Sequence, residues 1–412
     1  MENLGPDIFG KSEVVQSQPA ESLVNLANPS VIKVVGVGGG GGNAIKRMIK
    51  AGLTGVEFWE MNTDVQVLAL SNVPNSNKVQ LGAKLTNGLG AGGNSRIGEQ
   101  AAEEATQEIT AALEGADMVF IAAGMGGGTG TGAAPVVAKI AKDLGILTIA
   151  VVTKPFSFEG NRRMVSANEG LEKLREAVDS LLVIPNDKLL QVVDRRTGMK
   201  DAFVVVDEVI LRGVQGISDI ITKPGEINVD FADVKSVMEN SGSAVMGIGI
   251  GSGEGRAVEA AKAAVNSNLL ETSIHGASGL IVNVTGGPDM TLFEITDAIN
   301  LIRDSVLEDA NIIIGTSINE DMQGEVSITV VATGFELKPQ VQKIATPSET
   351  ISPSIDTIFA GLNTNMNLNS QNTGVNQSQP VQQNNSSNSN INMPSFVGSS
   401  FTNIEIPDFM KK

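Results

Sequence analysis

The residues best suited to chemistry are a glycine- and threonine-rich stretch, Gly124 to Gly132, with the sequence GMGGGTGTG. It follows an apolar run typical of a strand and precedes residues 133–144, which have the pattern of a helix with Pro135 in its first turn. Glycine lets backbone N–H groups approach an anion, and a helix N-terminus adds unpaired donors and a positive partial charge. The stretch therefore predicts a phosphate site, with the hydroxyls of Thr129 and Thr131 as further donors. A flexible linker, the alternative, does not suit a position between a buried strand and an amphipathic helix.

A second glycine-rich loop makes a nucleotide the expected ligand. Residues 31–37 form another strand-like run, Gly38 to Ala44 form the loop, and a helical segment over residues 45–51 ends before Gly52. Two such loops on neighbouring strands of one sheet suit a mononucleotide that carries several phosphates.

The same loop also fits the dinucleotide pattern GxGxxG through Gly36, Gly38 and Gly41, with Glu60 near the end of the next strand. A run of consecutive glycines matches this pattern almost by accident, and a dinucleotide site has no need of a loop like Gly126–Gly132. A dinucleotide-dependent metabolic enzyme is therefore the alternative from another class. It would bind a nicotinamide or flavin cofactor and would not assemble.

A third motif is expected to have no function. Residues Gly5 to Ser12 match the P-loop pattern GxxxxGK[ST], which must follow a strand and open a helix. Only four residues precede this match, and the segment that follows it, up to Pro29, has no helical apolar period. We do not expect a P-loop here.

The composition excludes several classes of site. The 412 residues include no cysteine, which excludes disulfides, thiolate metal sites and cysteine nucleophiles. The single histidine, His275, excludes histidine metal clusters, and its polar surroundings predict a residue of a surface loop. The net charge of −17 argues against a surface for nucleic acid or anionic membranes. No apolar run reaches ~18 residues, and no secretory or transit signal is recognisable, so we expect a cytoplasmic protein without direct membrane insertion.

Alternating strands and helices over residues 31–200 predict a doubly wound parallel sheet that positions these loops. The expected strands are Ile32–Gly36, Gly55–Trp59, Met118–Ala122, Leu147–Val152 and Ser180–Ile184, and the expected helices include residues 97–113 and 165–178.

One long helix is expected next, over residues 200–221, because apolar side chains recur there at helical spacing on a broad face. Such a helix spans roughly 33 Å and suits a bridge buried against two domains. A second domain is expected to follow, and its last two strands to form a hairpin. Its expected strands are Ser243–Ile250, Leu280–Val284, Asn311–Ile318 and Val326–Ala332, and its expected helices are Arg256–Asn266 and Leu292–Leu307.

The two ends of the chain have compositions of their own. Residues 1–30 are polar and interrupted by prolines, and residues 336–399 are dominated by Asn, Gln and Ser, so neither segment is expected to build a core. Residues 400–412 regain apolar side chains. A short amphipathic peptide on a long tether suits a docking motif, and a random tail is the alternative.

These motifs together resemble those of the tubulin/FtsZ family, and the resemblance extends through residues 31–335. The matching segments are Gly36–Ala44, Asn62–Asp64, Ala91–Asn94 and Gly124–Gly132 for phosphate loops, Pro155–Gly160 around the ribose, Asn228–Asp233 for the synergy loop and Ile406–Lys411 for the terminal recognition peptide.

The resemblance implies an α/β fold in which a Rossmann-like GTP-binding domain is joined by a long central helix to a smaller α+β domain. The implied boundaries are 1–30 for a disordered extension, 31–199 for the GTP-binding domain, 200–223 for the central helix, 224–335 for the C-terminal GTPase-activating domain, 336–399 for a disordered linker and 400–412 for a partner-docking peptide.

The resemblance also implies the residues that bind GTP or GDP. These are Gly39, Gly40, Gly41, Gly42, Asn43, Gly128, Thr129 and Gly130 at the phosphates, Glu159 at the ribose, Arg163 near the nucleotide, and Asn186, Phe203 and Asp207 around guanine. By residue type alone, Phe203 also suits a core, Arg163 a helix surface and Asp207 a solvated position.

The implied catalytic residues, Asn228, Asp230 and Asp233, project in the family from one subunit onto the nucleotide of the next. Asp230 and Asp233 share a face if a helix begins there, and two carboxylates can orient and polarise a water, with Mg²⁺ neutralising developing charge. Asp230 alternatively suits a helix N-cap, and both roles can coexist.

The implied function is that of a GTPase that polymerises head-to-tail and forms the division ring at midcell, on the inner face of the membrane. Partners are further copies of the chain and, through residues 400–412, membrane-tethering and regulatory division proteins. Two other members of the family are alternatives: a filament protein that does not hydrolyse GTP, which Asp230 and Asp233 argue against, and a plastid protein, which the non-basic N-terminus disfavours.

Overall fold

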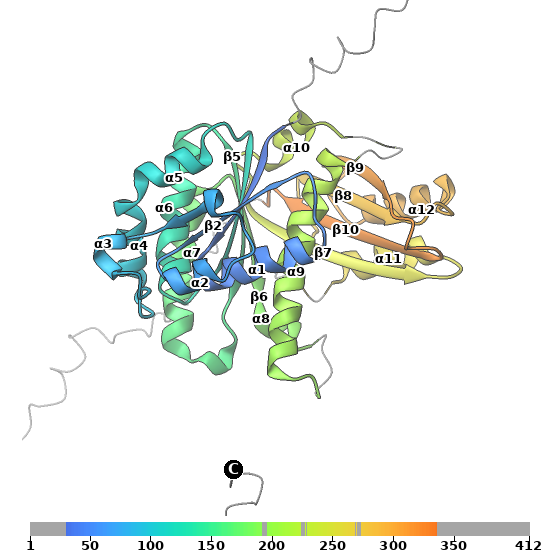
Figure 1. Ribbon diagram of the computed structural model, residues 1–412. Coiled ribbons are helices and arrows are strands. Elements are labelled where there is room, and N and C mark those ends of the chain that lie inside the picture. Colours follow the sequence, from blue (N-terminus) through green and yellow to red (C-terminus); the bar gives the residue numbers. More distant parts are fainter. Residues whose placement is uncertain are drawn as a thin grey trace, which may run out of the picture. The chain divides into compact units, whose positions relative to one another are not determined.

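The computed structural model of this chain describes residues 30–191, 196–223, 227, 229–267, 269 and 273–335. Over these residues a ten-stranded sheet has the order β3-β2-β1-β4-β5-β6-β7-β10-β8-β9 (Figure 1). Several predicted features lie outside the described residues: the N-terminal extension except residue 30, with its P-loop match at 5–12, Asn228, the linker 336–399 and the docking peptide 400–412.

The first half of the sheet is parallel, as the alternating pattern predicts. Its strands are β1 (Ile32–Val37), β2 (Glu57–Asn62), β3 (Lys78–Gln80), β4 (Met118–Gly124), β5 (Leu147–Lys154) and β6 (Ser180–Pro185). Its central strands, β1, β4 and β5, are buried almost throughout, because helices cover both faces of a parallel sheet. The strand β3 was not predicted, since three residues are too few to show a pattern.

The helices of this half begin earlier than predicted at both glycine loops. They are α1 (Gly38–Lys50), α2 (Val65–Ala69), α3 (Ala83–Thr86), α4 (Ser95–Glu104), α5 (Thr106–Leu113), α6 (Thr129–Asp143), α7 (Asn161–Ala177) and α8 (Asn186–Leu189), with single 3₁₀ turns η2 (Asn75–Asn77) and η3 (Ser157–Glu159). The glycine run itself lies within α1, which begins at Gly38. In α6 the helix starts at Thr129, so Pro135 lies inside it and not in its first turn, contrary to prediction.

The helix predicted over residues 97–113 is two helices, α4 and α5. Ala105 leaves helical geometry at φ −95° and ψ 20°, and the hydroxyl of Thr106 donates to the carbonyl of Glu103. A hydrogen bond from a side chain to the backbone competes with the backbone hydrogen bonds of a helix. Because the break involves a single residue, the spacing of the apolar residues does not reveal it.

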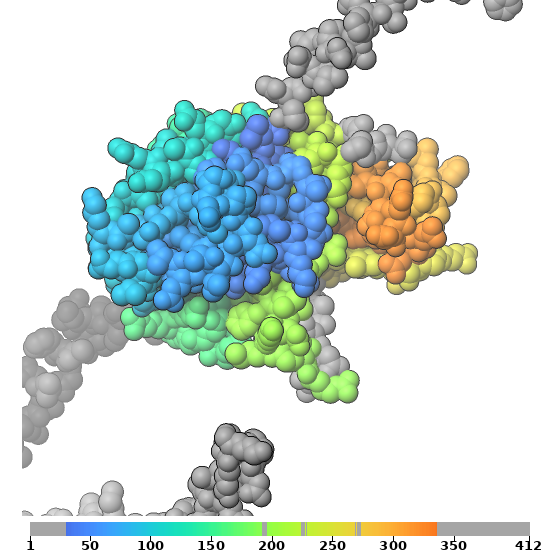
Figure 2. Space-filling model, viewed as in Figure 1, coloured from blue at the N-terminus to red at the C-terminus, as the bar shows by residue number. Residues whose placement is uncertain are grey.

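The long helix α9 (Met199–Thr222) is present as predicted and packs against both halves. It contacts α1 and β5 on one side and β8, β9 and β10 on the other. Gly216 is needed for this fit, because a Cβ there would lie 2.6 Å from Cγ2 of Thr329 on β10. In Figure 2 the blue and cyan surface of the first half and the orange surface of the second lie on either side of green and lime atoms from the region of α9.

The second half mixes parallel and antiparallel strands. Its elements are α10 (Phe231–Met238), β7 (Gly242–Ser252), α11 (Arg256–Val265), β8 (Gly279–Gly286), α12 (Leu292–Arg303), β9 (Asn311–Ile318) and β10 (Glu325–Thr333). The three residue pairs of β6 with β7 join it to the first half, from Ser180 with Gly242 to Leu182 with Ala244.

The predicted hairpin of the last two strands is wrong. The strand β10 lies between β7 and β8 and is antiparallel to both, whereas β9 pairs with β8 in parallel at the edge. Every residue of β10 after Glu325 is buried, as suits a central strand, while the two ends of β9, Asn311 and Ile318, are exposed. Among the described residues, none of the helices is both long and apolar enough to span a bilayer.

Candidate nucleotide site

The two glycine-rich turns meet at the carboxyl ends of β1 and β4, which are neighbours in the sheet. They touch directly, because a Cβ on Gly38 would lie 2.8 Å from the backbone nitrogen of Gly130. Gly38 also has φ +70°, in the left-handed region that favours glycine. The carboxyl edge of a parallel sheet is where open α/β folds bind ligands.

Both helices that leave these turns begin without a side-chain cap. The N-cap positions are Val37 for α1 and Gly128 for α6, and neither side chain accepts a hydrogen bond from the first turn. Elsewhere, Asp64 caps α2 and Thr291 caps α12 through their side chains. Two uncapped helix N-termini that converge on one point present free N–H donors and positive partial charge to an anion.

A pocket of about 350 Å³ opens at this point. It is lined by Gly39, Gly40, Asn43, Gly124, Met125, Gly127, Gly128, Thr129, Gly130, Thr153, Pro155, Glu159, Arg163, Asn186, Phe203, Val206, Asp207 and Ile210. Its size suits a small organic ligand. All of the residues predicted to bind nucleotide are among these except Gly41 and Gly42.

Gly41 and Gly42 are buried behind the pocket because they belong to α1 and face the sheet. A Cβ on Gly41 would strike the carbonyl of Ala122 in β4, and one on Gly42 would strike Oε1 of Glu60. Glu60 is 2% exposed and burial raises its pKa, so it is no ribose ligand of a dinucleotide site. The dinucleotide alternative therefore has no acidic residue in the expected place.

The base end of the pocket carries three polar or aromatic groups. Asn186 is 4% exposed, and its Oδ1 has no hydrogen-bond partner in the described part of the chain, so the pocket is the one side from which a ligand can satisfy it. Phe203 is 39% exposed and presents a ring to the cavity. It is therefore not a core residue, although residue type alone left that open.

Burial raises the pKa of Asp207 from 3.8 to about 6, and the nearby Arg47 opposes this shift. The ionised carboxylate is thus poorly hydrated, which destabilises the folded protein until hydrogen-bond donors of a ligand reach it. The edge of guanine offers two N–H donors side by side, and a carboxylate accepts both. Asp207 is not the solvated residue that its mid-helix position also allowed.

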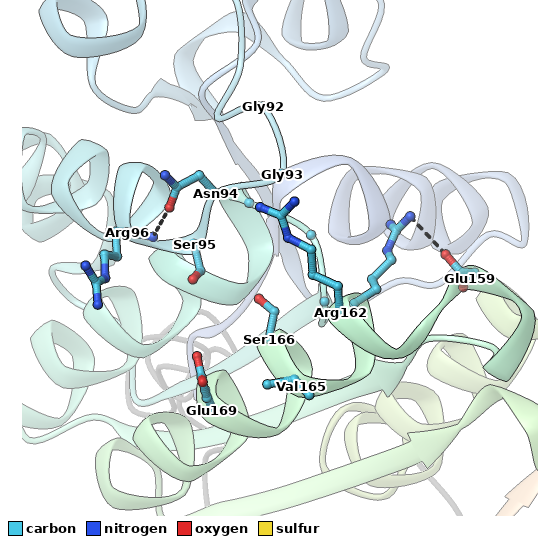
Figure 3. A pocket seen from close by; sticks show the side chains of 14 residues that line it. Gly92, Gly93, Asn94, Ser95, Arg96, Glu159, Arg162, Val165, Ser166 and Glu169 are labelled. Atoms are coloured by element: carbon cyan, nitrogen blue, oxygen red, sulfur yellow. Dashed lines mark hydrogen bonds and ion pairs between the residues drawn. The ribbon is translucent and has the colours of Figure 1, made fainter. Parts of the chain in front are cut away.

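The ribose side carries a preformed ion pair. Arg163 Nη1 lies 2.9 Å from Oε2 of Glu159, one turn earlier in the chain (dashed line at Glu159 in Figure 3). The other oxygen of Glu159 accepts a hydrogen bond of 2.9 Å from the backbone N–H of Phe156. The Glu159 side chain is 13% exposed, so its orientation is set before any ligand arrives.

The two threonines of the glycine loop have different roles. The hydroxyl of Thr129 lines the pocket and lies 2.7 Å from the hydroxyl of Thr63. Thr131 is buried, and its hydroxyl accepts a hydrogen bond of 2.8 Å from the backbone N–H of Gly126. Thr131 therefore shapes the loop and does not face the pocket, contrary to the prediction that both hydroxyls serve as donors to phosphate.

Two further cavities border the pocket at Gly128. One, of about 300 Å³, is lined by residues 62–64, the predicted second phosphate loop, and by residues 91–93 of the predicted third loop, Ala91–Asn94. The other, of about 910 Å³, lies between α4 and α7, and Figure 3 shows Arg162 extending across it toward the loop of Gly92 and Gly93. All predicted phosphate loops therefore meet around one point.

The predicted catalytic carboxylates do not line this pocket. Asp230 is the N-cap of α10 and accepts a 2.8 Å hydrogen bond from the backbone N–H of Asp233, whose own side chain reaches back to the Asp230 N–H at 3.4 Å. The N-cap alternative for Asp230 is thus confirmed. α10 follows the C-terminal end of α9 (Figure 1). Phe203 and Asp207 belong to the first half of α9, Met199–Thr222.

The described residues include no group of three His, Asp or Glu side chains arranged to hold a metal ion. His275 is exposed in a turn, as predicted.

Several lining residues were missed at the sequence level. Thr153 is the last residue but one of β5, at the carboxyl edge of the sheet, so its position in the strand is a signal for it. Val206 and Ile210 lie three residues after Phe203 and Asp207, on the same face of α9. Met125 and Gly127 belong to a loop that was recognised, but the backbone path decides which of its residues face the ligand.

Two family models match the chain. The model of the "Tubulin/FtsZ family, GTPase domain" matches residues 31–194, and that of the "FtsZ family, C-terminal domain" matches residues 242–336. Together they cover the helices and strands that precede α9 and those that follow α10.

Solved structures agree with these matches. An empty FtsZ dimer of M. jannaschii is 46% identical, with a TM-score of 0.73, over 78% of this chain and 93% of that one. A mutant FtsZ of the same organism is 47% identical, with a TM-score of 0.73, over 76% and 94%. A GTPγS-bound protofilament of CetZ2 from Haloferax volcanii is 24% identical, with a TM-score of 0.62, over 73% and 92%, which shows a shared fold alone.

Proposed function

Because this chain belongs to the Tubulin/FtsZ family of GTPases, we propose that it polymerises head-to-tail and hydrolyses GTP at the interface between subunits. The guanine nucleotide binds in the pocket beside the two glycine-rich turns. The predicted roles are phosphate binding by the uncapped starts of α1 and α6, ribose binding by Glu159, and base recognition by Asn186, Phe203 and Asp207.

The observation that carries the proposal is the distance between the pocket and α10. Asp207 lies in the pocket, and Thr222 lies fifteen positions further along α9, about 22 Å of helix, before the chain reaches Asp230. Asp230 and Asp233 therefore belong to the opposite end of the subunit, where they face the pocket of a neighbour if subunits stack head-to-tail. Such an interface does not close on itself and makes filaments.

Among the residues that the structure describes, the phosphate end of the pocket has no free carboxylate that could act as a general base. Asp64, which borders it, caps α2 by accepting from the backbone N–H groups of Gln66 and Val67. A neighbour's Asp230 and Asp233 would orient a water for attack on the γ-phosphate, and Asn228 is proposed to assist them. Bound Mg²⁺ would supply charge neutralisation at the phosphates. Loss of the γ-phosphate then removes contacts at the interface and weakens it.

We propose division as the cellular role, with filaments at a midcell ring on the cytoplasmic side of the membrane. The match to the FtsZ C-terminal domain and the identity of 46% to an FtsZ support this role over that of CetZ proteins, whose identities are 21% and 24%. The apolar peptide at residues 400–412 is the proposed site for membrane-tethering and regulatory partners.

The experiment that tests the interfacial site measures phosphate release from GTP and Mg²⁺ over a range of protein concentrations. Turnover per molecule is expected to rise steeply above a threshold concentration. In Asp230→Asn, which keeps an N-cap acceptor but loses the charge, turnover is expected to fall by about 10²–10⁴-fold while GTP binding is unchanged.

Asp143→Asn is the matched control, because Asp143 is an exposed acid at the end of α6, away from α10. It is expected to behave as the wild type. Turnover per molecule that stays constant down to dilute protein would mean that one chain contains the whole site, and the proposal would be wrong.

A further inference from the structure

Asp187 lies outside the nucleotide pocket but joins the two turns that carry its ribose and base groups. It is the second residue of α8, directly after Asn186. Its Oδ1 accepts a hydrogen bond of 2.9 Å from the backbone N–H of Ser157, and its Oδ2 accepts from the Ser157 hydroxyl. Ser157 begins η3, the turn that ends at Glu159. One carboxylate therefore holds two donors of the neighbouring turn.

The sheet explains why these turns are neighbours. β5 and β6 pair in parallel, with Lys154 opposite Pro185 at their carboxyl ends, so η3 and α8 leave the sheet side by side. Among the described residues, no backbone–backbone hydrogen bond joins the two turns outside the strand ladder. The side chain of Asp187 therefore supplies the polar link between them.

The turn held by Asp187 positions two groups of the pocket. The N–H of Phe156, next to Ser157, donates to Glu159 and so fixes the carboxylate expected at the ribose. The ring of Phe156, which is 1% exposed, packs edge-on against Phe203 with 5.5 Å between ring centroids. Displacement of Ser157 would move both Glu159 and the aromatic support of Phe203.

We propose that Asp187 is a positioning residue for the nucleoside, which holds Glu159 and Phe203 in register with Asn186 without touching the ligand. The proposal rests on the proposed function, that the pocket binds GTP. It implies that the contributions of the ribose hydroxyls and of the base to affinity are coupled through one carboxylate. A group that only stabilised the fold would lower affinity for all nucleotides by the same factor.

The experiment compares GTP with 2′,3′-dideoxy-GTP in equilibrium binding to dilute protein, below the assembly threshold. The wild type is expected to bind GTP at least tenfold more tightly than 2′,3′-dideoxy-GTP, because the dideoxy sugar offers Glu159 no hydroxyl. In Asp187→Ala the affinity for GTP is expected to fall about tenfold and the ratio of the two affinities to approach one. Asp187→Asn, which can still accept from Ser157, is expected to restore most of the ratio.

Asp117→Ala is the matched control. The Asp117 carboxylate also accepts from a backbone N–H, that of Val31 at 2.7 Å, but at the amino end of β1, on the opposite edge of the sheet. In Asp117→Ala the ratio of the affinities for GTP and 2′,3′-dideoxy-GTP is expected to equal that of the wild type. An unchanged ratio in a folded Asp187→Ala protein would overturn the positioning role. Failure of the wild type itself to bind GTP would instead overturn the proposed function.

Discussion

At the scale of single residues, Asp207 shows how a binding group costs stability before its ligand arrives. Burial raises its pKa to about 6, so the ligand-free folded state holds a proton more tightly than the unfolded chain, where the pKa is 3.8. Between these two pH values the folded state binds more protons. The free energy of unfolding therefore falls as pH rises from about 4 to about 6.

Asp207 alone is expected to lower the free energy of unfolding by up to about 3 kcal/mol between pH 4 and pH 6, since each pKa unit corresponds to about 1.4 kcal/mol. Asp207→Asn removes this dependence and is expected to be the more stable ligand-free protein at pH 7. Denaturant unfolding of both proteins between pH 4 and pH 7 measures the difference. The comparison of the two proteins is needed because burial also raises the pKa of Glu60, so Glu60 contributes a pH dependence of the same sign in both.

The same titration governs binding. A protonated Asp207 cannot accept both guanine donors, so nucleotide affinity of the wild type is expected to fall as pH drops below 6. The affinity of Asp207→Asn is expected to be lower at pH 7 and flat over this range. A wild-type affinity that is equally flat would contradict the assignment of Asp207 to the base.

At the scale of elements, α9 holds the two halves of the molecule at a fixed distance. Its fit depends on Gly216, where the helix approaches Thr329 of β10 more closely than a side chain allows. Glycine is a poor helix former, so its presence inside a 24-residue helix needs a packing reason. The approach to β10 is that reason.

Gly216→Ala is expected to destabilise the protein by about 1–3 kcal/mol, although alanine favours a helix, because overpacking exceeds the gain in propensity. The second change Thr329→Ser removes the methyl group that the new Cβ would meet and is expected to recover much of the loss. Thermal unfolding of the single and double variants measures both effects. A stabilising Gly216→Ala would mean that the contact is not tight.

At the scale of the whole molecule, the nucleotide pocket and α10 belong to opposite ends of α9, so a subunit has two unlike ends. The proposed active site takes its pocket from one chain and its carboxylates from the next. Two defective chains should then repair each other when they are mixed.

The mixture proposed as a test contains Asp233→Asn, which keeps its pocket, and the double variant Asn186→Ala with Asp207→Ala, which loses base recognition. Each variant alone is expected to have less than about 1% of wild-type turnover. Asp233→Asn loses a carboxylate that acts as general base, which contributes about 10²–10⁴-fold, and the double variant does not recognise the base of its nucleotide. An equal mixture is expected to recover up to about one quarter, since half of the pockets and half of the carboxylates are intact and pair at random.

Sedimentation is the control that both variants enter the same filaments. Co-sedimentation without any recovered phosphate release would contradict an active site shared between subunits. Recovery that does not depend on the fraction of each variant would point to residual activity of one chain.

Local patterns in the sequence determined much of this protein. The two glycine turns, the alternation of strands and helices and the long apolar face of α9 depend on backbone freedom and on burial within short segments, so they are readable from neighbouring residues. The same motifs carried the resemblance to the tubulin/FtsZ family, and the base, ribose and phosphate groups predicted from it line one pocket, apart from Gly41 and Gly42.

Only the tertiary structure decided which segments meet. β10 enters the sheet between β7 and β8 and pairs with both, an order that no pattern within residues 311–333 expresses. Gly41 and Gly42 face the sheet because the glycine run is itself helical, and Asp187 reaches Ser157 because β5 and β6 are adjacent. These outcomes depend on contacts between residues far apart in the chain. The free energy of such contacts cannot be inferred from the sequence of any single segment.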